Sequence, residues 1–307
     1  MICLEFQQLK YFQAIAKTQN ISLAAKQLFI AQPSLSQTLK RLENEVGTEL
    51  FDRVGKQIIL NDAGKIFLKY TNDIFNALDN AQREIKAHKE ELIANVCICV
   101  QATSLLLPEI ISKIQAQHPK IHLQILQHTD MEETMTMDLK IYADYICKPC
   151  KSNIVLMDEP IGIVLPAKHR LVDKEHIFIN ESFVSLSKGH NLYNINCHYC
   201  EEFDFMPQIS TYVDSPNIMR DLLKINIGVA FVPQYTWNYF YKDSLVFRKI
   251  EDMPMSRKII LSWNEKRFMT PAVENCKKII IDYFNYYQKK ISVICFLYSV
   301  YYTFLIM

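Results

Sequence analysis

Apolar residues recur every three or four positions along the first part of the chain, which predicts a series of short amphipathic helices. The first is expected over residues 4–18, and Ser22 is expected to cap a second one in the stretch SLAAKQL. The third is expected within IAQPSLSQTLKRLENEVG, residues 30–47, where Gly47 favours the end of a helix. The following RVGKQIIL predicts a hairpin, so residues 1–61 are predicted to form a winged helix-turn-helix.

The third predicted helix has two contrasting faces. Leu35, Leu39 and Leu42 repeat at helical spacing and are expected to be buried. The small side chains opposite them would let the backbone approach a neighbouring surface, and the free N–H groups at a helix start favour a phosphate. This pattern favours a DNA recognition helix, and the alternative is an ordinary amphipathic surface helix. The outer face is predicted to carry Pro33, Ser36, Gln37 and Lys40, flanked by Ser34 and Arg41.

Residues 62–93 contain a longer helical pattern in which Asn61 is the expected cap. Its apolar positions are separated by three or four residues throughout, which predicts a coiled-coil seam roughly 48 Å long. We interpret this segment as a linker helix that pairs two chains, and the alternative is a helix packed on its own domain. The seam consists of Phe67, Tyr70, Ile74, Leu78, Ala81, Ile85, His88 and Leu92.

From Ala94 onward the pattern changes to short apolar runs. VCICV and IHLQILQ are typical of strands, and SLLLPEIISKIQAQHP between them is typical of a helix. This order predicts a parallel α/β domain over residues 94–290, with further strands at NIVLM, IGIVLP and VAFVP and a helix at PNIMRDLLKIN. The whole chain is therefore expected to be an α+β multidomain protein.

The composition of the whole chain indicates no particular class of protein, but the composition of one segment does. The chain has 307 residues, half of them apolar and 22% charged, as in ordinary globular proteins, and its net charge of +1 favours no particular partner. Residues 7–42, however, contain five basic residues and no acidic one, which suits a polyanion. Nine cysteines without a secretory leader indicate reduced thiols and a cytoplasmic location. No arrangement of nucleophile, base and orienting acid stands out, so neither an enzyme nor a cofactor is expected.

The run from LKYFQAIAKTQ to AGK, over about the first 65 residues, resembles the N-terminal domain of LysR-type transcriptional regulators. The resemblance lies in SLAAKQL, QPSLSQ, the LE…VG..LF.R segment and the wing that leads into AGK. This chain has Asn61-Asp62 where the family usually has a threonine, and asparagine also caps helices well. The resemblance implies that double-stranded promoter DNA is the partner. It further implies that Gln32, Pro33, Ser34, Ser36, Gln37 and Lys40 lie in the major groove and that Arg53 supports the wing on the DNA backbone.

LLLPEIISKIQAQHPKIHLQI, EPIGIVLPAKHRL and INIGVAFVP are similar to segments of the family's C-terminal domain. The resemblance implies a periplasmic-binding-protein-like (type 2) effector domain of two α/β subdomains with a cleft between them. Subdomain I is then expected over about 94–165 and 265–290, and subdomain II over about 166–264. The stretch DLKIYADYIC and Asn226 depart from the family's usual glycines.

A small-molecule effector is expected in that cleft. Thr103 and Ser104 come after a predicted strand and before a predicted helix, where hydroxyls and free N–H groups can hold a small anion. The resemblance places an effector contact there and at Thr129. Our hypothesis is a carboxylate-bearing metabolite, and the alternative is a plain Ser/Thr helix cap.

Two C-x-x-C pairs could carry another function. Cys147 and Cys150 form CKPC, and Cys197 and Cys200 form CHYC. Such pairs can bind zinc or undergo redox chemistry, although their separation exceeds common zinc-knuckle spacing. Structural or incidental thiols are the favoured interpretation. A thiol- or metal-responsive regulator is the alternative function, and a thiol oxidoreductase is a more distant one.

The last segment, residues 291–307, is apolar and uncharged and follows Lys289-Lys290. Its length is at the lower limit for a membrane-spanning helix, and its composition also suits a strand or a subunit interface. A membrane-anchored signalling protein therefore stays an alternative, although the less favoured one. The preferred prediction is an effector-controlled, sequence-specific regulator that self-associates as a dimer or tetramer through its linker helix.

Overall fold

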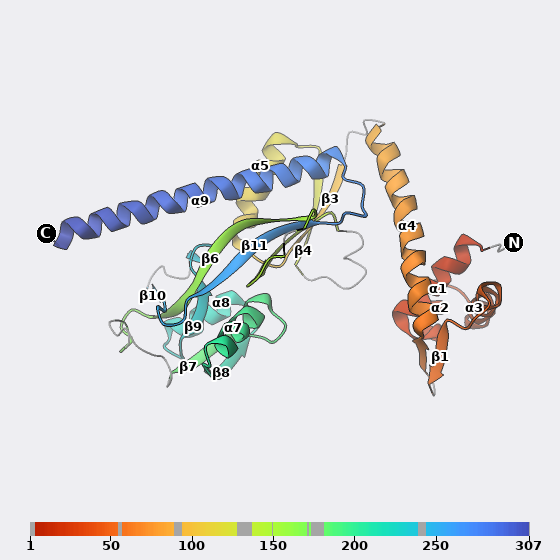
Figure 1. Cartoon of the computed structure of the whole chain (residues 1–307), viewed down its shortest axis with the longest axis horizontal. Coiled ribbons are helices and arrows are strands. Elements are labelled where there is room, and N and C mark those ends of the chain that lie inside the picture. Colours follow the sequence, from red (N-terminus) through yellow and green to blue (C-terminus); the bar gives the residue numbers. More distant parts are fainter. Residues whose placement is uncertain are drawn as a thin grey trace. The chain divides into compact units, whose positions relative to one another are not determined.

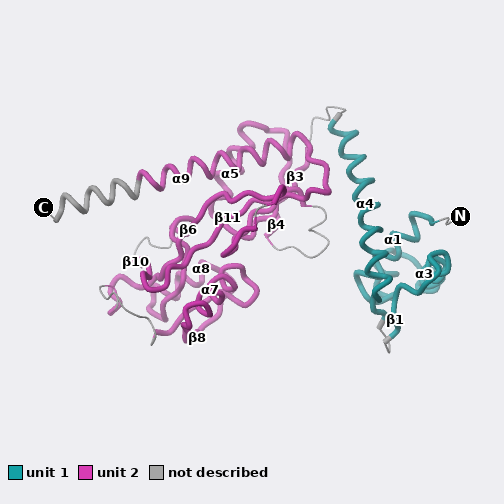
Figure 2. Tube along the Cα trace, in the orientation of Figure 1, with its two compact units in different colours: residues 1–88 teal, residues 89–307 magenta. Residues whose placement is uncertain are grey.

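The computed structural model describes residues 4–54, 57–88, 94–127, 137–148, 150–170, 172, 181–238 and 244–306. The chain divides into two compact units, residues 1–88 and residues 89–307, which are coloured separately in Figure 2. The predicted limits of the three functional segments and of the two subdomains stay predictions.

Unit 1 consists of three short helices, a two-stranded wing and a long final helix (Figure 1). β1 and β2 pair in an antiparallel manner, as the predicted hairpin requires. The turn residues 55 and 56 lie outside the described residues. The elements are α1 (Phe6–Thr18), α2 (Ile21–Gln27), α3 (Gln32–Val46), β1 (Phe51–Val54), β2 (Gln57–Leu60) and α4 (Asp62–His88).

The helix boundaries in unit 1 follow from local capping. α2 begins at Ile21, and the side chain of Asn20 accepts a hydrogen bond from the N–H of Leu23 at 3.0 Å. The prediction that Ser22 caps this helix was therefore wrong, because Ser22 lies inside its first turn. α3 carries a proline in its first turn and ends at Gly47, whose φ of 83° is the left-handed conformation that glycine adopts without strain.

The start of α4 lies very close to the core of unit 1. Asn61 caps this helix as predicted, since its Oδ1 accepts a hydrogen bond from the N–H of Gly64 at 2.8 Å. A Cβ at Gly64 would lie 2.0 Å from the backbone oxygen of Leu50. The glycine of the AGK motif is therefore required by this close approach.

Beyond its first turns, α4 exposes most of its predicted seam. Phe67 packs against the core of unit 1, but Tyr70, Ile74, Leu78 and Ile85 are exposed in the single chain. An apolar stripe of this length on a surface helix is typical of an interface. The predicted continuation of the helix to about Ile93, including Leu92, lies outside the described residues.

Among its described residues, unit 2 contains one large mixed sheet and one small sheet (Figure 1). The unit begins with a strand, a helix and a strand, as predicted. Its elements are β3 (Ala94–Val100), η1 (Ser104–Leu106), α5 (Leu107–Gln117), β4 (Ile121–Leu126), β5 (Leu139–Asp144), β6 (Asn153–Pro166), β7 (Ser182–Leu186), α7 (Asn191–Glu202), β8 (Gln208–Val213), α8 (Pro216–Lys224), β9 (Ala230–Pro233), β10 (Leu245–Arg248), β11 (Met255–Trp263) and α9 (Pro271–Ile306).

The large sheet has the order β10-β6-β11-β5-β3-β4, and β9 pairs with β6. β3 is parallel to both β4 and β5, which confirms the predicted parallel β-α-β unit. NIVLM and IGIVLP were predicted as separate strands, but they form the single strand β6. The reason is tertiary, because β11 pairs with β6 from Asn153 to Ile161 and holds the two apolar runs in one line.

Two groups of helices cover unit 2. α5 and α9 contact each other, and α9 also contacts β3 and β6 of the large sheet. The small parallel sheet β7-β8 lies with α7 and α8 in the other half of the unit (Figure 1). The small sheet and its two helices thus form a second, smaller α/β assembly in unit 2, as the effector-domain resemblance implied.

α9 begins at Pro271 and extends into the apolar segment over residues 291–307. Its backbone stays helical to Ile306, so the predicted tail continues α9. Within the described residues, we find no helix with both the length and the apolar character of a membrane span.

Candidate nucleic-acid interface and ligand site

The outer face of α3 carries small and polar side chains on an apolar base. Leu35 and Leu42 are fully buried and Leu39 is nearly so, which confirms the predicted inner face. Lys40 leaves the same helix on the opposite side. Of the predicted contact residues, Ser36 is half-buried, and the exposed ones are Gln32, Pro33, Ser34, Gln37 and Lys40.

The start of α3 has no side-chain cap. Ala31 occupies the N-cap position and makes no side-chain hydrogen bond, and the first turn contains no acidic residue. The N–H groups and the positive end of the helix dipole are therefore not neutralised by a carboxylate of the first turn. Such an end can bind a phosphate group.

The two adjacent cations of α3 differ in their surroundings. Arg41 lies 3.0 Å from a carboxylate oxygen of Glu45 and 3.3 Å from one of Glu5. Lys40 is exposed on the outer face, where its charge faces solvent. Arg53 is exposed on β1, opposite Ile58 in the wing, as its predicted role requires.

Phe29 is a residue of this surface that sequence reasoning missed. It lies in the turn between α2 and α3, has a φ of 56° and is 95% exposed. A large aromatic side chain rarely adopts this backbone conformation or such exposure. The available signal was a phenylalanine outside the apolar stripes of both neighbouring helices.

The predicted effector contacts occupy different environments. Thr103 is 2% exposed, and its Oγ1 accepts or donates no hydrogen bond within the described part of the chain. Its φ of 62° is strained for a β-branched residue, and its side chain does not cap η1, which argues against the plain-cap alternative. Ser104 is exposed, and Thr129 lies outside the described residues.

A polar cavity of about 200 Å³ opens between β3 and β5 of the large sheet and the first half of α7. Lys140 supplies a cation at this cavity, and its Nζ lies 5.1 Å from the centre of the Tyr142 ring. The Tyr142 hydroxyl is protonated at neutral pH and can donate a hydrogen bond, and burial raises its pKa further above the ordinary value. The lining consists of Gln101, Lys140, Tyr142, Ala143, Asp144, Tyr145, Asn191, Asn194 and Ile195.

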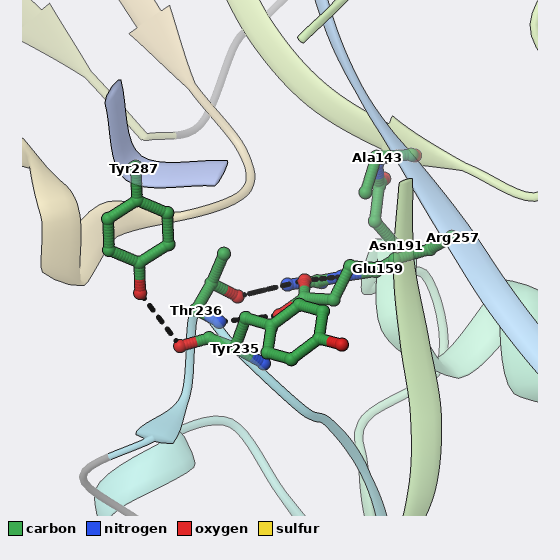
Figure 3. A network of polar contacts seen from close by, with 7 residues as sticks. All are labelled: Ala143, Glu159, Asn191, Tyr235, Thr236, Arg257 and Tyr287. Atoms are coloured by element: carbon green, nitrogen blue, oxygen red, sulfur yellow. Dashed lines mark hydrogen bonds and ion pairs between the residues drawn. The ribbon is translucent and has the colours of Figure 1, made fainter. Parts of the chain in front are cut away.

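A buried ion pair lies where β6, β11 and the segment after β9 meet (Figure 3). Arg257 Nε donates to Glu159 Oε2 at 2.9 Å, and both residues are at most 2% exposed. Glu159 also accepts hydrogen bonds from the backbone N–H groups of Tyr235 and Thr236. Tyr287 of α9 donates to the backbone oxygen of Tyr235 at 3.0 Å, which ties the helix to the same segment.

α7 contacts the large sheet directly at the polar cavity. Asn191 Nδ2 donates to the backbone oxygen of Ala143 at 2.8 Å (Figure 3). Farther along the helix, the His198 ring stacks on Tyr145, with 3.7 Å between the ring centres. A shift of α7 would therefore change the contacts between the two halves of unit 2.

The four cysteines of the C-x-x-C pairs are free thiols. Cys147 and Cys150 lie in the loop after β5, whereas Cys197 and Cys200 lie on α7. Burial raises the pKa of Cys200 to about 12, which makes its thiolate scarce at neutral pH. Among the residues that the structure describes, no three His, Cys, Asp or Glu side chains gather as a metal site would require.

A winged helix-turn-helix followed by a larger α/β unit is typical of the class of DNA-binding transcriptional regulators. The family model for the bacterial regulatory helix-turn-helix protein, lysR family, matches residues 6–65. The model for the LysR substrate binding domain matches residues 95–285. The chain belongs to the LysR family and is a LysR-type transcriptional regulator with an effector-binding domain.

Sequence relatives and solved structures match this chain over nearly its whole length. The uncharacterized HTH-type transcriptional regulator YybE of Bacillus subtilis is 28% identical over 295 residues, which cover 92% of this chain and 100% of YybE. A full-length OxyR variant from Pseudomonas aeruginosa has a TM-score of 0.59 at 19% identity and covers 91% of this chain and 97% of its own. Full-length CbnR complexed with its target DNA has a TM-score of 0.57 at 17% identity, and the match covers 90% of this chain and 99% of the CbnR chain. These structures support the fold.

Proposed function

We propose that the N-terminal end of α3 enters the major groove of promoter DNA. The observation that carries this proposal is the exposed row of small and polar side chains above three buried leucines. Gln37 can offer a donor and an acceptor to one base edge, and Lys40 can reach guanine or a phosphate. Ser34 and Pro33 leave room for the backbone to come close to the groove.

Sequencing of genomic fragments retained by the purified full-length protein would define the sites that it binds. Titrations on a recovered site should then give an affinity loss of at least about 30-fold for a Gln37→Ala, Lys40→Ala variant, since each of the two contacts contributes about 1–3 kcal/mol. The salt dependence should also become shallower, because one phosphate contact is lost.

A matched control lies in the other unit. Gln117 and Lys120 are also exposed and have the same spacing as Gln37 and Lys40. A Gln117→Ala, Lys120→Ala variant should bind DNA like the parent protein. Equal affinities for the parent and the α3 variant would refute the proposed docking.

We further propose that two chains pair through the exposed stripe of α4. The support for this proposal is the apolar seam of Tyr70, Ile74, Leu78 and Ile85, which is exposed in the single chain. Substituting Ile74 and Leu78 with glutamate would remove the seam at its centre. Sedimentation should then report a smaller oligomer than the parent chain.

The effector-binding site is proposed at the polar cavity beside α7. Lys140 supplies one positive charge for a carboxylate. Thr103 does not line this cavity, but its orphaned hydroxyl belongs to the segment that directly follows the lining residue Gln101. Strained residues with unsatisfied groups are typical of ligand-binding positions. Our hypothesis is therefore a small carboxylate that closes the two halves of unit 2 around itself and shifts the regulator between two states.

A thermal-shift screen of small carboxylates on the full-length protein would identify a ligand. Stabilisation by that ligand should be lost in a Lys140→Met variant and kept in Lys148→Met, which changes an exposed lysine of the neighbouring loop. A Thr103→Val, Ser104→Ala variant should lose the response as well. A full response in this double variant would exclude these two residues as contacts.

The proposed regulator acts without catalysis, as members of its family generally do. A cytoplasmic location stays our proposal, because promoter DNA is the expected partner and the described cysteines are free thiols.

A further inference from the structure

A second cavity, of about 210 Å³, lies in unit 2 between α7 and the small sheet β7-β8. It opens on the face of α7 that is turned toward the small sheet, and none of its lining residues lines the polar cavity described above. Its walls are mainly apolar, and they include Phe183, Leu186, Phe205, Ile209, Met219 and Phe231.

Asn196 differs from the other polar residues of the lining, which are Ser185, Tyr193 and Glu201. Asn196 lines the cavity, and its Oδ1 is buried without a hydrogen-bond partner in the part of the chain that the structure describes. A buried amide oxygen without a donor costs about 1–3 kcal/mol, which a ligand that donates one hydrogen bond would recover. Tyr193 and Cys197 line the cavity on the same helix.

We propose that this cavity is a second ligand site, which binds a small aromatic or other cyclic apolar molecule that donates one hydrogen bond to Asn196. An enclosed apolar cavity of roughly 150 Å³ is large enough for benzene, so this one can hold a ring or a fused ring pair. The apolar walls oppose a carboxylate, because they offer no compensation for the loss of its hydration. The two cavities of unit 2 therefore select opposite ligand chemistries.

The helix α7 couples the two cavities. Asn196 and Cys197 face the apolar cavity, while Asn191 and Asn194 line the polar one. The same helix holds the large sheet through Asn191 and through the stacking of His198 on Tyr145. A ligand that fixes α7 against the small sheet would thus change the geometry of the polar cavity.

Calorimetric titration of the full-length protein with indole and with indene tests the site. The two probes have nearly the same shape, but indole carries an N–H donor that indene lacks. In an Asn196→Leu variant, indole should bind about tenfold more weakly, and indene should bind with at least its parent affinity. A Gln208→Leu variant, at an exposed amide of β8 that lines neither cavity, should bind both probes like the parent protein.

Thiol labelling gives a second test on the unaltered protein. Saturating indole should slow the alkylation of Cys197 by iodoacetamide several-fold, and the exposed Cys150 outside the cavity should react at an unchanged rate. Peptide mass spectrometry distinguishes the two cysteines. An Ile209→Trp variant, which fills the cavity, should lose both the binding of indole and the protection of Cys197.

Three results would overturn the proposal. They are the absence of saturable binding of indole up to millimolar concentration, equal losses for indole and indene in Asn196→Leu, and alkylation of Cys197 at the same rate with and without saturating indole. Because neither test involves DNA, its outcome is independent of the proposed docking of α3 and of the carboxylate site.

Discussion

The outer face of α3 and the buried network around Glu159 use polar residues in opposite ways. On α3 the polar groups are exposed, belong to consecutive turns of one helix and are available to another molecule. Glu159 is buried and is held by Arg257, 98 residues later, and by Thr236, 77 residues later. The first arrangement is a surface for binding, and the second fixes the positions of three separate segments.

This difference predicts how each region responds to substitution. Removing an exposed polar group changes binding and leaves the fold intact, because water replaces the lost partner. Removing one member of a buried ion pair leaves its partner charged and desolvated, which destabilises the fold. Both tryptophans, Trp237 and Trp263, lie in unit 2, so their fluorescence follows that unit alone, while circular dichroism follows both.

The largest effect is expected for Glu159→Gln. The guanidinium of Arg257 would then be buried without its carboxylate, and we expect unit 2 to lose about 3–5 kcal/mol of unfolding free energy. Urea denaturation followed by tryptophan fluorescence measures this loss. Binding to the DNA site should persist at urea concentrations where both proteins are folded.

A double variant sharpens this prediction. Glu159→Leu combined with Arg257→Met removes both charges, and it should be more stable than Glu159→Gln. Recovery should be partial, because the backbone N–H groups of Tyr235 and Thr236 would lose their acceptor. A double variant no more stable than the single one would contradict the assignment of the loss to the unpaired arginine.

Leu35→Ala should have the next largest effect and should act on the other unit. Leu35 is fully buried beneath the outer face of α3, and its truncation should cost about 2–5 kcal/mol in unit 1. The helical signal should show an earlier transition, whereas the tryptophan transition should be unchanged. A shift of the tryptophan transition would show that the two units do not unfold independently.

Tyr287→Phe should have a smaller effect that depends on pH. Burial raises the pKa of Tyr287 to about 12, and in the unfolded chain this phenol ionises near pH 10. Its protonated form therefore stabilises unit 2 fully below about pH 10, and this stabilisation is lost as the pH rises toward 12. At neutral pH the variant should lose about 1 kcal/mol, because the hydrogen bond to Tyr235 is removed.

The alkaline decline of stability should also be shallower in Tyr287→Phe than in the parent. Part of the alkaline decline should persist in the variant because of the neighbouring Tyr283. Burial and the hydrogen bond to Glu109 raise the pKa of Tyr283 as well. Denaturant titrations at pH 7, 9.5 and 10.5 would measure both slopes. Parallel slopes for the two proteins would contradict the assignment to Tyr287.

The smallest effect on stability is expected for Ser34→Ala. Ser34 is exposed at the start of α3, so the unfolding free energy should change by less than about 0.5 kcal/mol. If α3 docks in the groove as proposed, affinity for the DNA site should still fall. A loss of stability comparable to that of Leu35→Ala would break the contrast between the two faces of this helix.

Particular residues mark where prediction from the sequence succeeded and where it ended. The faces of α3, the cap at Asn61 and the parallel pairing of β3 with β4 were all predicted and are confirmed. The cap of α2 was predicted wrongly, because it depends on the residue at which the helix begins. The single strand β6 was predicted as two strands, because its continuity depends on pairing with β11. The DNA contacts and the effector contacts stay predictions.

The sequence by itself determined the three short helices and the wing of unit 1, the first β-α-β unit of unit 2 and the family of this regulator, because these depend on spacings of three or four residues or on short contiguous motifs. Only the tertiary structure decided which distant residues meet. It joined Glu159 to Arg257, left the hydroxyl of Thr103 and the amide oxygen of Asn196 buried without partners, and opened two cavities on the two sides of α7. The physical reason is that helical periodicity is a local property of the chain, whereas burial and hydrogen-bond satisfaction depend on the packing of the whole unit.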